Sequence, residues 1–116
     1  MTHVETVNRT AELNDRFRAG DRSVNGVMFI TQGVRAFLEK EELAADVVIK
    51  AIKEFNDFTE GNDPYGERDF GEVTIHEQRI WWRIDYYDLQ LKYGSEDPSN
   101  NSITKRVLTI LTPSEY

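Results

Sequence analysis

Two segments that are close together in the chain, residues 71–75 and 80–84, alternate apolar and polar side chains with the period of a β-strand. We predict a hairpin whose turn is Glu77 and Gln78, so that one face is apolar and the other carries a cross-strand ion pair. The pairs expected from this turn are Ile75 with Ile80, Val73 with Trp82, Gly71 with Ile84, Thr74 with Trp81 and Glu72 with Arg83. A ribbon with one apolar face must pack against another layer of structure.

Helical patterns elsewhere in the chain supply that layer. Apolar residues recur with a period near 3.6 over residues 39–58, which predicts one long helix. A thinner apolar stripe predicts a second helix over residues 4–18, ended by Gly20. These helices can cover the apolar side of the hairpin and of any strands that join it.

Two further strands are expected. The apolar run 27–31 predicts a buried strand that is broken off by Gly33, and the run 106–112 predicts a last strand stopped by Pro113. The expected fold is therefore α+β: a single domain over residues 1–116, order α-β-α-β-β-β, with helices packed on one face of a mainly antiparallel sheet. An unpaired edge beside the strand of Val27 or Val107 could support a homodimer.

The formal net charge of -7 is concentrated in one part of the sequence. Residues 1–53 contain 8 acidic and 8 basic residues, whereas residues 54–97 contain 12 acidic and 4 basic residues. A field of this sign repels phosphate backbones, so we expect no direct nucleic-acid binding, and it argues against an mRNA-cleaving toxin, which needs a basic surface. It favours a protein partner with a basic surface, unless the charge serves only solubility.

Composition also narrows the chemistry and the compartment. The chain has no cysteine, which excludes disulfides, Cys-based zinc sites and thiolate nucleophiles. Its first residues lack the basic and apolar regions of a signal peptide, and no run of about 18 apolar residues occurs. We expect a cytoplasmic protein that does not enter a membrane.

Clustered carboxylates are the candidates for catalysis. Asp63, Glu67 and Asp69 are closely spaced in a predicted loop, and Asp85 could approach them at the end of the sheet. Such a cluster raises the pKa of its members or binds a hard cation, so these four residues could serve a small hydrolase, with or without Mg²⁺ or Ca²⁺. The alternative is that they cap turns or are solvated. We prefer a non-catalytic protein without metal or cofactor, because no phosphate-binding loop, nucleophile elbow or zinc-protease motif occurs.

Aromatic residues near the acids suggest a binding surface. Trp82 belongs to the core by its pattern, whereas Trp81, Tyr86, Tyr87 and Tyr65 are expected on the outer face or rim of the sheet. Exposed rings beside carboxylates can anchor a partner rich in arginine. The candidate binding residues are Asp63, Tyr65, Glu67, Asp69, Trp81, Tyr86, Tyr87, Asp88, Glu96 and Asp97.

Four sequence motifs carry a resemblance to a known family. They are Asn62-Asp-Pro-Tyr-Gly-Glu-Arg-Asp-Phe-Gly71, Trp82-Arg-Ile-Asp-Tyr-Tyr-Asp88, Gly94-Ser-Glu-Asp-Pro98 and the segment from Val107 to Tyr116. Over about residues 13–116 the chain resembles a bacterial domain family of unknown function, found mainly in alphaproteobacteria and often on plasmids and other mobile elements.

The resemblance implies no catalytic residue, since that family has no assigned activity. Carriage on mobile elements would favour plasmid maintenance or resistance to host defences. An acidic domain could act in the second way by occupying the nucleic-acid channel of a defence protein, as an inhibitor that mimics nucleic acid.

Overall fold

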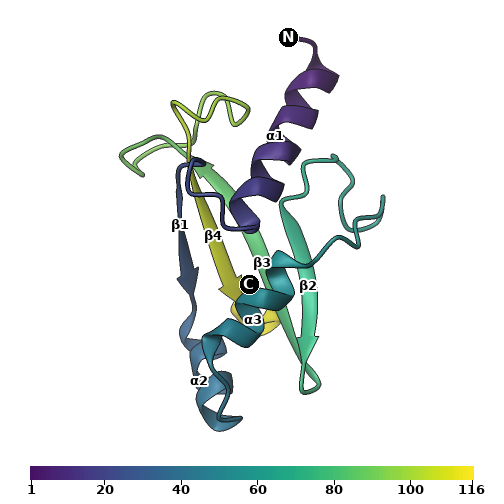
Figure 1. Cartoon of the computed structure of the whole chain (residues 1–116), viewed down its shortest axis with the longest axis vertical. Coiled ribbons are helices and arrows are strands. Elements are labelled where there is room, and N and C mark those ends of the chain that lie inside the picture. The colour runs from purple at the N-terminus through teal and green to yellow at the C-terminus, as the bar shows by residue number, and fades with distance from the viewer.

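The sheet of this protein is mixed and has the strand order β1-β4-β3-β2 (Figure 1). The computed structural model describes residues 1–116. Its strands are β1 (Gly26–Ile30), β2 (Phe70–Ile75), β3 (Gln78–Tyr87) and β4 (Lys105–Leu111). β1 runs parallel to β4, and the other two pairs are antiparallel. The predicted α+β class is confirmed.

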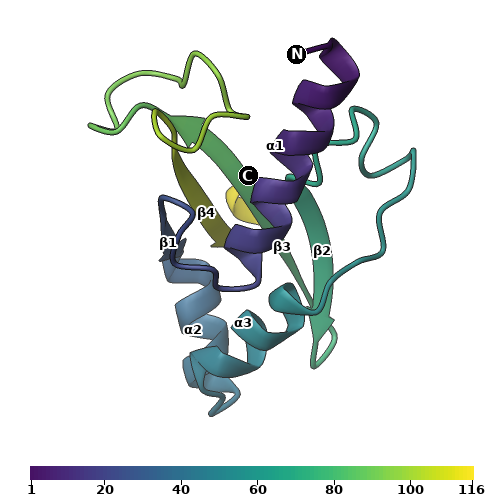
Figure 2. The same cartoon turned by 45° about the horizontal axis from the view of Figure 1, so that its top comes forward.

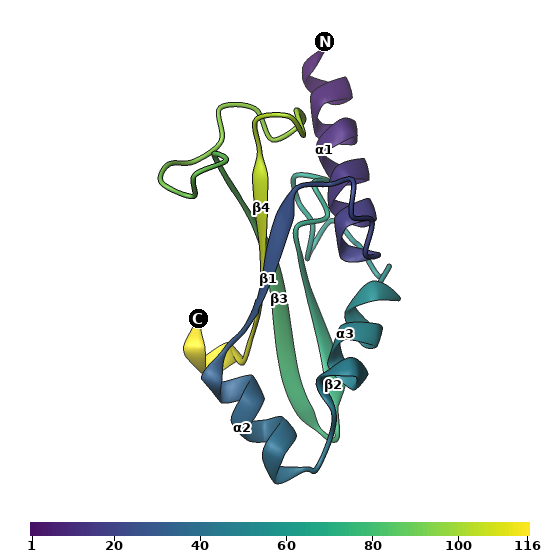
Figure 3. The ribbon, with the colours of Figure 1, turned by 60° about the vertical axis from the view of Figure 1, so that its left-hand side comes forward.

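Three α-helices lie on one side of this sheet, as predicted (Figure 3). They are α1 (His3–Arg18), α2 (Gln32–Lys40) and α3 (Ala45–Lys53), and a short 3₁₀ turn, η1 (Pro113–Glu115), ends the chain. α2 and α3 lead from β1 at one edge of the sheet to β2 at the opposite edge. The core lies between these helices and the sheet, and its buried members are Val34, Leu38, Val48, Ile52, Ile80, Trp82, Ile84, Leu108 and Ile110.

The prediction of one helix over residues 39–58 is wrong. α2 ends at Lys40, and Glu42 has a positive φ of 54°, which a right-handed helix cannot contain. The Leu43 amide donates to the Leu38 carbonyl at 2.9 Å, a bond typical of a helix end. The apolar period continues across the break because α2 and α3 each pack an apolar face against the core. Periodicity alone therefore could not reveal the position of the break.

Gly33 does not end the first strand region but lies in the first turn of α2. Thr31 is the N-cap of that helix, and the Glu115 carboxylate accepts hydrogen bonds from the Thr31 hydroxyl (2.6 Å) and the Gly33 amide (3.0 Å). A Cβ at Gly33 would lie 2.6 Å from the Glu115 carboxyl group. The residue before the last of the chain therefore caps the helix that follows β1.

This cap makes part of the stability dependent on pH. Burial raises the pKa of Glu115, but hydrogen bonds from Thr31, Thr112 and Gly33 outweigh it and lower the pKa to about 2. Because the folded pKa is depressed, the contribution is present above the unfolded pKa of about 4.3 and is lost as pH falls towards 2. We expect Glu115→Gln to lower the free energy of unfolding by about 1 kcal/mol at pH 6.

Urea unfolding of both proteins between pH 6 and pH 2 tests this expectation. The difference between wild type and Glu115→Gln should shrink as the pH falls. A difference that stays constant over this range would show that the charge of Glu115 does not stabilise the cap.

The hairpin of β2 and β3 has a different turn from the predicted one. His76 and Glu77 form it, both with positive φ, and Val73 lies opposite Ile80 while Gly71 lies opposite Trp82. Each residue of β2 pairs with a β3 residue two positions earlier than predicted. A shift by an even number of residues leaves the same side chains on the apolar face and the same ones on the polar face. The polar-face ion pair is present but joins Glu72 to Arg79 (2.7 Å), not to Arg83.

β1 is an edge strand and is not buried as predicted. Its Met28 is 42% exposed and its Phe29 55% exposed. The strand that contains Val107, in contrast, lies between β1 and β3 and offers no edge. Arg35 Nε donates to the Ile30 carbonyl at 3.0 Å, which occupies one acceptor of β1. A homodimer through β1 therefore stays a prediction.

Candidate functional site

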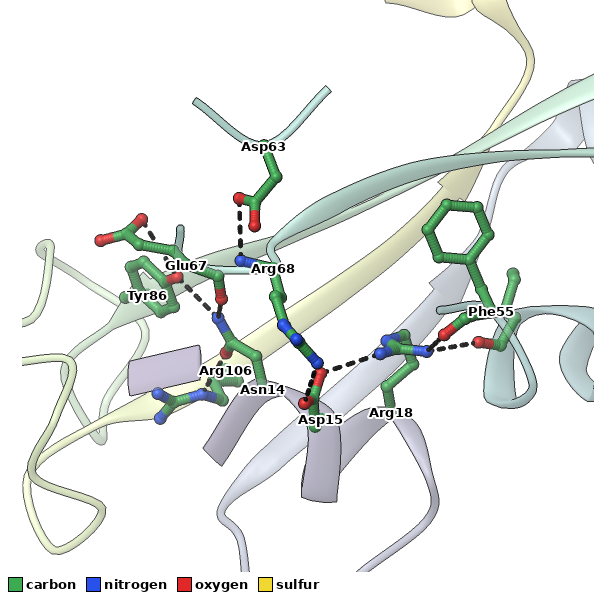
Figure 4. A network of polar contacts seen from close by, with 10 residues as sticks. Asn14, Asp15, Arg18, Phe55, Asp63, Glu67, Arg68, Tyr86 and Arg106 are labelled. Atoms are coloured by element: carbon green, nitrogen blue, oxygen red, sulfur yellow. Dashed lines mark hydrogen bonds and ion pairs between the residues drawn. The ribbon is translucent and has the colours of Figure 1, made fainter. Parts of the chain in front are cut away.

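A buried polar network joins α1 to the sheet and to the loop before β2 (Figure 4). Asn14 and Arg106 are both 0% exposed, and Arg106 Nε donates to the Asn14 side-chain oxygen at 2.7 Å. The Asn14 amide nitrogen donates to the Tyr86 hydroxyl (2.8 Å) and to the Glu67 main-chain carbonyl (2.9 Å). A single amide thus fixes the relative positions of three segments.

A second set of contacts continues this network along α1. Asp15 accepts from Arg18 and from Arg68, each at 2.9 Å, and so bridges the two guanidinium groups (Figure 4). Arg18 also donates to the Ile52 and Phe55 carbonyls at the end of α3. We call residues 54–69 the acidic loop; these contacts attach it to α1 at both ends.

Electrostatic repulsion links Asp63, Glu67 and Asp69 to one another, whereas Asp85 affects only Asp69 and is itself paired with Arg83 at 3.2 Å. Burial raises the pKa of Glu67, and repulsion from Asp69 and Asp63 adds to the effect. Burial also raises the pKa of Asp69, with repulsion from Asp63 and Asp85 in the same direction. The Tyr86 hydroxyl lies 3.4 Å from the Glu67 carboxylate, and burial raises its pKa as well.

The hydrolase alternative gains no further support from this geometry. No group of three or more His, Asp or Glu side chains is placed to hold a metal ion. His76 lies in the β2–β3 turn, at the end of the sheet opposite the acidic loop (Figure 1). Asp63 serves the loop itself, since it accepts from the Arg68 amide at 3.0 Å. Perturbed carboxylates also occur in purely structural networks.

The raised pKa of Glu67 predicts that its charge destabilises the fold. A folded pKa above the unfolded one means that ionisation costs stability as the pH rises from the unfolded pKa through the folded pKa. We therefore expect Glu67→Gln to be more stable than wild type at pH 7 and equal to it at about pH 4. Urea unfolding at the two pH values measures the difference, with Glu60→Gln as the control for net charge. A wild type more stable than Glu67→Gln at pH 7 would refute this prediction.

The remaining candidate binding residues lie in different regions. Asp88 and Glu96 line one hollow in the connection between β3 and β4, whereas Asp97 accepts from the Ser99 amide (3.1 Å) and is used in a turn. Tyr65 is 82% exposed at the tip of the acidic loop. These acids and this ring lie at the same end of the sheet but on different segments.

The outer face of the sheet holds two of the four aromatic residues that were expected on the outer face or rim. Trp81 donates to the Glu72 carboxylate at 2.7 Å and packs edge to face against Phe70 and Tyr116. Tyr87, on the same side of β3, is half-buried. Tyr86 was expected on the rim, but it points to the helix side, into the network around Asn14. The predicted binding set therefore does not form one surface.

The sequence analysis missed Asn14, Arg18 and Arg106, which organise the site. A signal was present for one of them: Arg106 occupies a position that alternates with Leu108 and Ile110, so the pattern places it on the apolar face of β4. A charged residue at such a position needs buried partners. The sequence does not reveal that the partner is in α1.

Few of the carboxylates in residues 54–97 are neutralised by a base of the same molecule. Of the 12 acidic residues, only Glu72 and Asp85 lie within ion-pair distance of a base, Arg79 and Arg83 respectively. Arg68 is occupied by Asp15 of α1. The acids without such a partner are Glu54, Asp57, Glu60, Asp63, Glu67, Asp69, Glu77, Asp88, Glu96 and Asp97.

An open cleft of about 640 Å³ lies between α1 and the acidic loop, which run beside each other in Figure 2. Its walls carry the acids Glu60, Asp63, Glu12 and Asp15 and the bases Arg16 and Arg68, so that acids outnumber bases. The two α1 acids are paired with arginines, whereas the two loop acids are not. The cleft is therefore a polar, negatively charged depression.

These features define an α+β domain that has a mixed four-stranded sheet, one helical layer and an acidic loop fastened to its first helix. The chain belongs to the family described as "Protein of unknown function (DUF3768)", which it matches over residues 30–115. This match confirms the resemblance to an uncharacterised domain family. No curated protein and no solved structure is detectably similar to the chain. None of its helices combines the length and the apolar character needed to cross a membrane.

Proposed function

We propose that this protein is a non-catalytic interaction module whose acidic loop binds a basic surface of another protein. The observation that carries the proposal is that ten of the 12 carboxylates in residues 54–97 have no basic partner within the molecule. Unpaired surface carboxylates produce a field that extends over about 8 Å at physiological salt and attracts a partner of opposite sign. Such complementarity gives specificity and fast association.

The acidic loop is suited to this role because hydrogen bonds hold it in place. The Asn62 side chain accepts from the Thr59 amide (2.7 Å) and donates to the Asp57 carbonyl (2.8 Å). The contacts of Asp63 with the Arg68 amide and of Glu67 with Asn14 fix its second half. A surface that is ordered before binding loses less conformational entropy on association.

Tyr65 is the natural anchor on this surface. Its ring is 82% exposed and lies between Asp63 and Glu67 in the sequence. An arginine of the partner could stack on the ring while it pairs with a neighbouring carboxylate. Asp88 and Glu96, in the connection between β3 and β4, would extend the field at the same end of the molecule.

A narrower form of the proposal concerns the kind of basic surface. The nucleic-acid channel of a host defence protein is such a surface, and an acidic domain of a mobile element could inhibit it by occupying the channel. This form is supported by the negative field and by the family resemblance. It predicts that the protein competes with DNA or RNA for a basic binding protein, which a gel-shift competition measures.

A comparison of two triple charge reversals tests the binding surface. Glu54→Lys, Asp57→Lys and Glu60→Lys together reverse three exposed carboxylates of the acidic loop, and Glu39→Lys, Glu42→Lys and Glu77→Lys reverse three exposed carboxylates elsewhere. Both variants change the net charge equally. We expect the first to weaken binding of a nona-arginine peptide by about tenfold and the second by about threefold or less.

Titrations at two salt concentrations complete the test, and binding should weaken steeply as salt is added. Capture of proteins from a host lysate, with the two variants as baits, then identifies natural partners. If both triple variants lose affinity equally, the charge acts only as a general field and the acidic loop is not the binding surface. If the captured protein binds the first variant as well as wild type, the proposed function fails.

A further inference from the structure

A cavity of about 250 Å³ lies on the other side of α1 from the acidic cleft and shares no lining residue with it. It is enclosed by the end of α1, by α3 and by the inner face of β1 and β4. Its wall is mainly apolar and includes Met28, Ile49, Leu108 and Ile110. Ile110 and Leu108 are buried, whereas Met28 is partly exposed, so the cavity opens beside β1.

The charged residues at this cavity are basic, whereas the net charge of the protein is negative. The only charged residues that line it are Arg18 and Lys53, although the net charge of the chain is -7. Lys53 is exposed and lies within ion-pair distance of no carboxylate. Arg18 is 6% exposed, and its Nε is buried without a hydrogen-bond partner.

We infer that this cavity binds a small monocarboxylate with an apolar body, such as a medium-chain or aromatic acid. The apolar body lies against Phe17, Met28 and Ile49, the accessible apolar residues of the wall, and the carboxylate pairs with the Lys53 ammonium group at the opening. Small-molecule sites usually combine an apolar wall with a few placed polar groups in this way. At about 30 Å³ per small group, the volume accepts a body of about eight heavy atoms.

The charge of Lys53 makes the inference selective, since Arg18 is already paired with Asp15. A neutral molecule of the same shape gains only the apolar contacts, and a cation is repelled by Lys53. The site is therefore expected to prefer an acid over an alcohol and an alcohol over an amine of equal chain length. This inference is independent of the proposed function, because it uses neither the acidic loop nor its cleft.

NMR titration of the ¹⁵N-labelled full chain with octanoate, 1-octanol and octylammonium tests it. We expect octanoate to shift the amide signals of Gly20, Met28, Ile49 and Lys53 saturably, with a Kd of about 1 mM or below, and octylammonium to bind about tenfold more weakly. Lys53→Gln should weaken octanoate about three- to fivefold and leave 1-octanol unchanged.

Two further variants serve as controls. Lys50→Gln removes an exposed cation from the same helix without touching the cavity, and it should bind octanoate as wild type does. Ile49→Phe adds bulk inside the cavity and should abolish binding of octanoate and 1-octanol, with thermal unfolding used to verify that the variant folds. Absence of saturable shifts, equal binding of octanoate and octylammonium, or equal effects of Lys53→Gln and Lys50→Gln would each overturn the inference.

Discussion

Replacing Gly71 with alanine is expected to lower the free energy of unfolding by about 3 kcal/mol, although it adds a single methyl group. Gly71 is buried opposite Trp82 in the β2–β3 pair, and a Cβ there would lie 2.5 Å from the indole nitrogen. The indole cannot move aside easily, since Phe55 and Phe58 pack edge to face against it and the Arg18 guanidinium lies 4.9 Å from its ring centre. Urea unfolding followed by Trp fluorescence measures the loss.

A matched control and a double variant isolate the cause. Gly61→Ala has its nearest contact at 3.6 Å and should change stability by about 0.5 kcal/mol or less. In a Trp82→Phe background the ring is smaller, so Gly71→Ala should cost clearly less than in wild type. An equal cost in both backgrounds would mean that the loss comes from the backbone of β2 and not from contact with Trp82.

Replacing Asn14 with alanine is expected to cost about 3 kcal/mol, because it leaves the buried Arg106 without its side-chain acceptor. The Nη1 atom of Arg106 already has no partner, and only the bond from Nη2 to the Pro98 carbonyl would remain. Asn8→Ala, at an exposed position of the same helix, supplies the same change in helix propensity and should have little effect. Urea unfolding compares the two variants.

The double variant Asn14→Ala with Arg106→Met distinguishes an unpaired charge from a simple loss of packing. If the cost of Asn14→Ala arises from the buried cation, it should largely disappear once Arg106 is methionine. Tyr86→Phe removes the hydrogen bond from Asn14 and the long one to Glu67, and should cost about 1 kcal/mol. Additive losses for Asn14 and Arg106 would contradict this account of the network.

The parts of the fold that follow from side-chain periodicity could be predicted from the sequence. The segment 106–112 differs from β4 by one residue at each end, and the alternation in 71–75 and 80–84 correctly separates the two faces of the hairpin. Periodicity is a local property that burial imposes on each element separately. It therefore survives even when the pairing of the elements is assigned incorrectly.

The errors occurred where single backbone angles decide the structure. Glu42 and His76 both have positive φ without being glycine; glutamate does not signal this conformation, and histidine adopts it only somewhat more often than other residues. Glu42 divides the expected long helix in two, and His76 with Glu77 shifts the hairpin turn by one position. In both places tertiary packing stabilises an angle that local preference disfavours.

In the candidate site, too, the features that are local in sequence could be predicted and the long-range contacts could not. The carboxylates Asp63, Glu67 and Asp69 were recognisable as a group because they are close in sequence, and Asp85 was added to them from the expected geometry of the sheet. The contact between Asn14 and Arg106 joins residues 92 positions apart. No pattern in a single sequence reports such a pair. The direction of Tyr86, in contrast, follows from its alternation with Trp82 and Ile84 along β3 and could have been predicted.

The order of the strands has a consequence for synthesis on the ribosome. Gly26 of β1 pairs with Arg106 of β4, and Thr31 at the start of α2 binds Glu115, so β1 has no partner strand until residues 105–115 have been synthesised. Until then a nascent chain exposes Met28 and Phe29 with both edges of their strand unpaired. Chains truncated before β4 should therefore be substrates for chaperones and proteases, and the four-stranded sheet should form only once β4 is available.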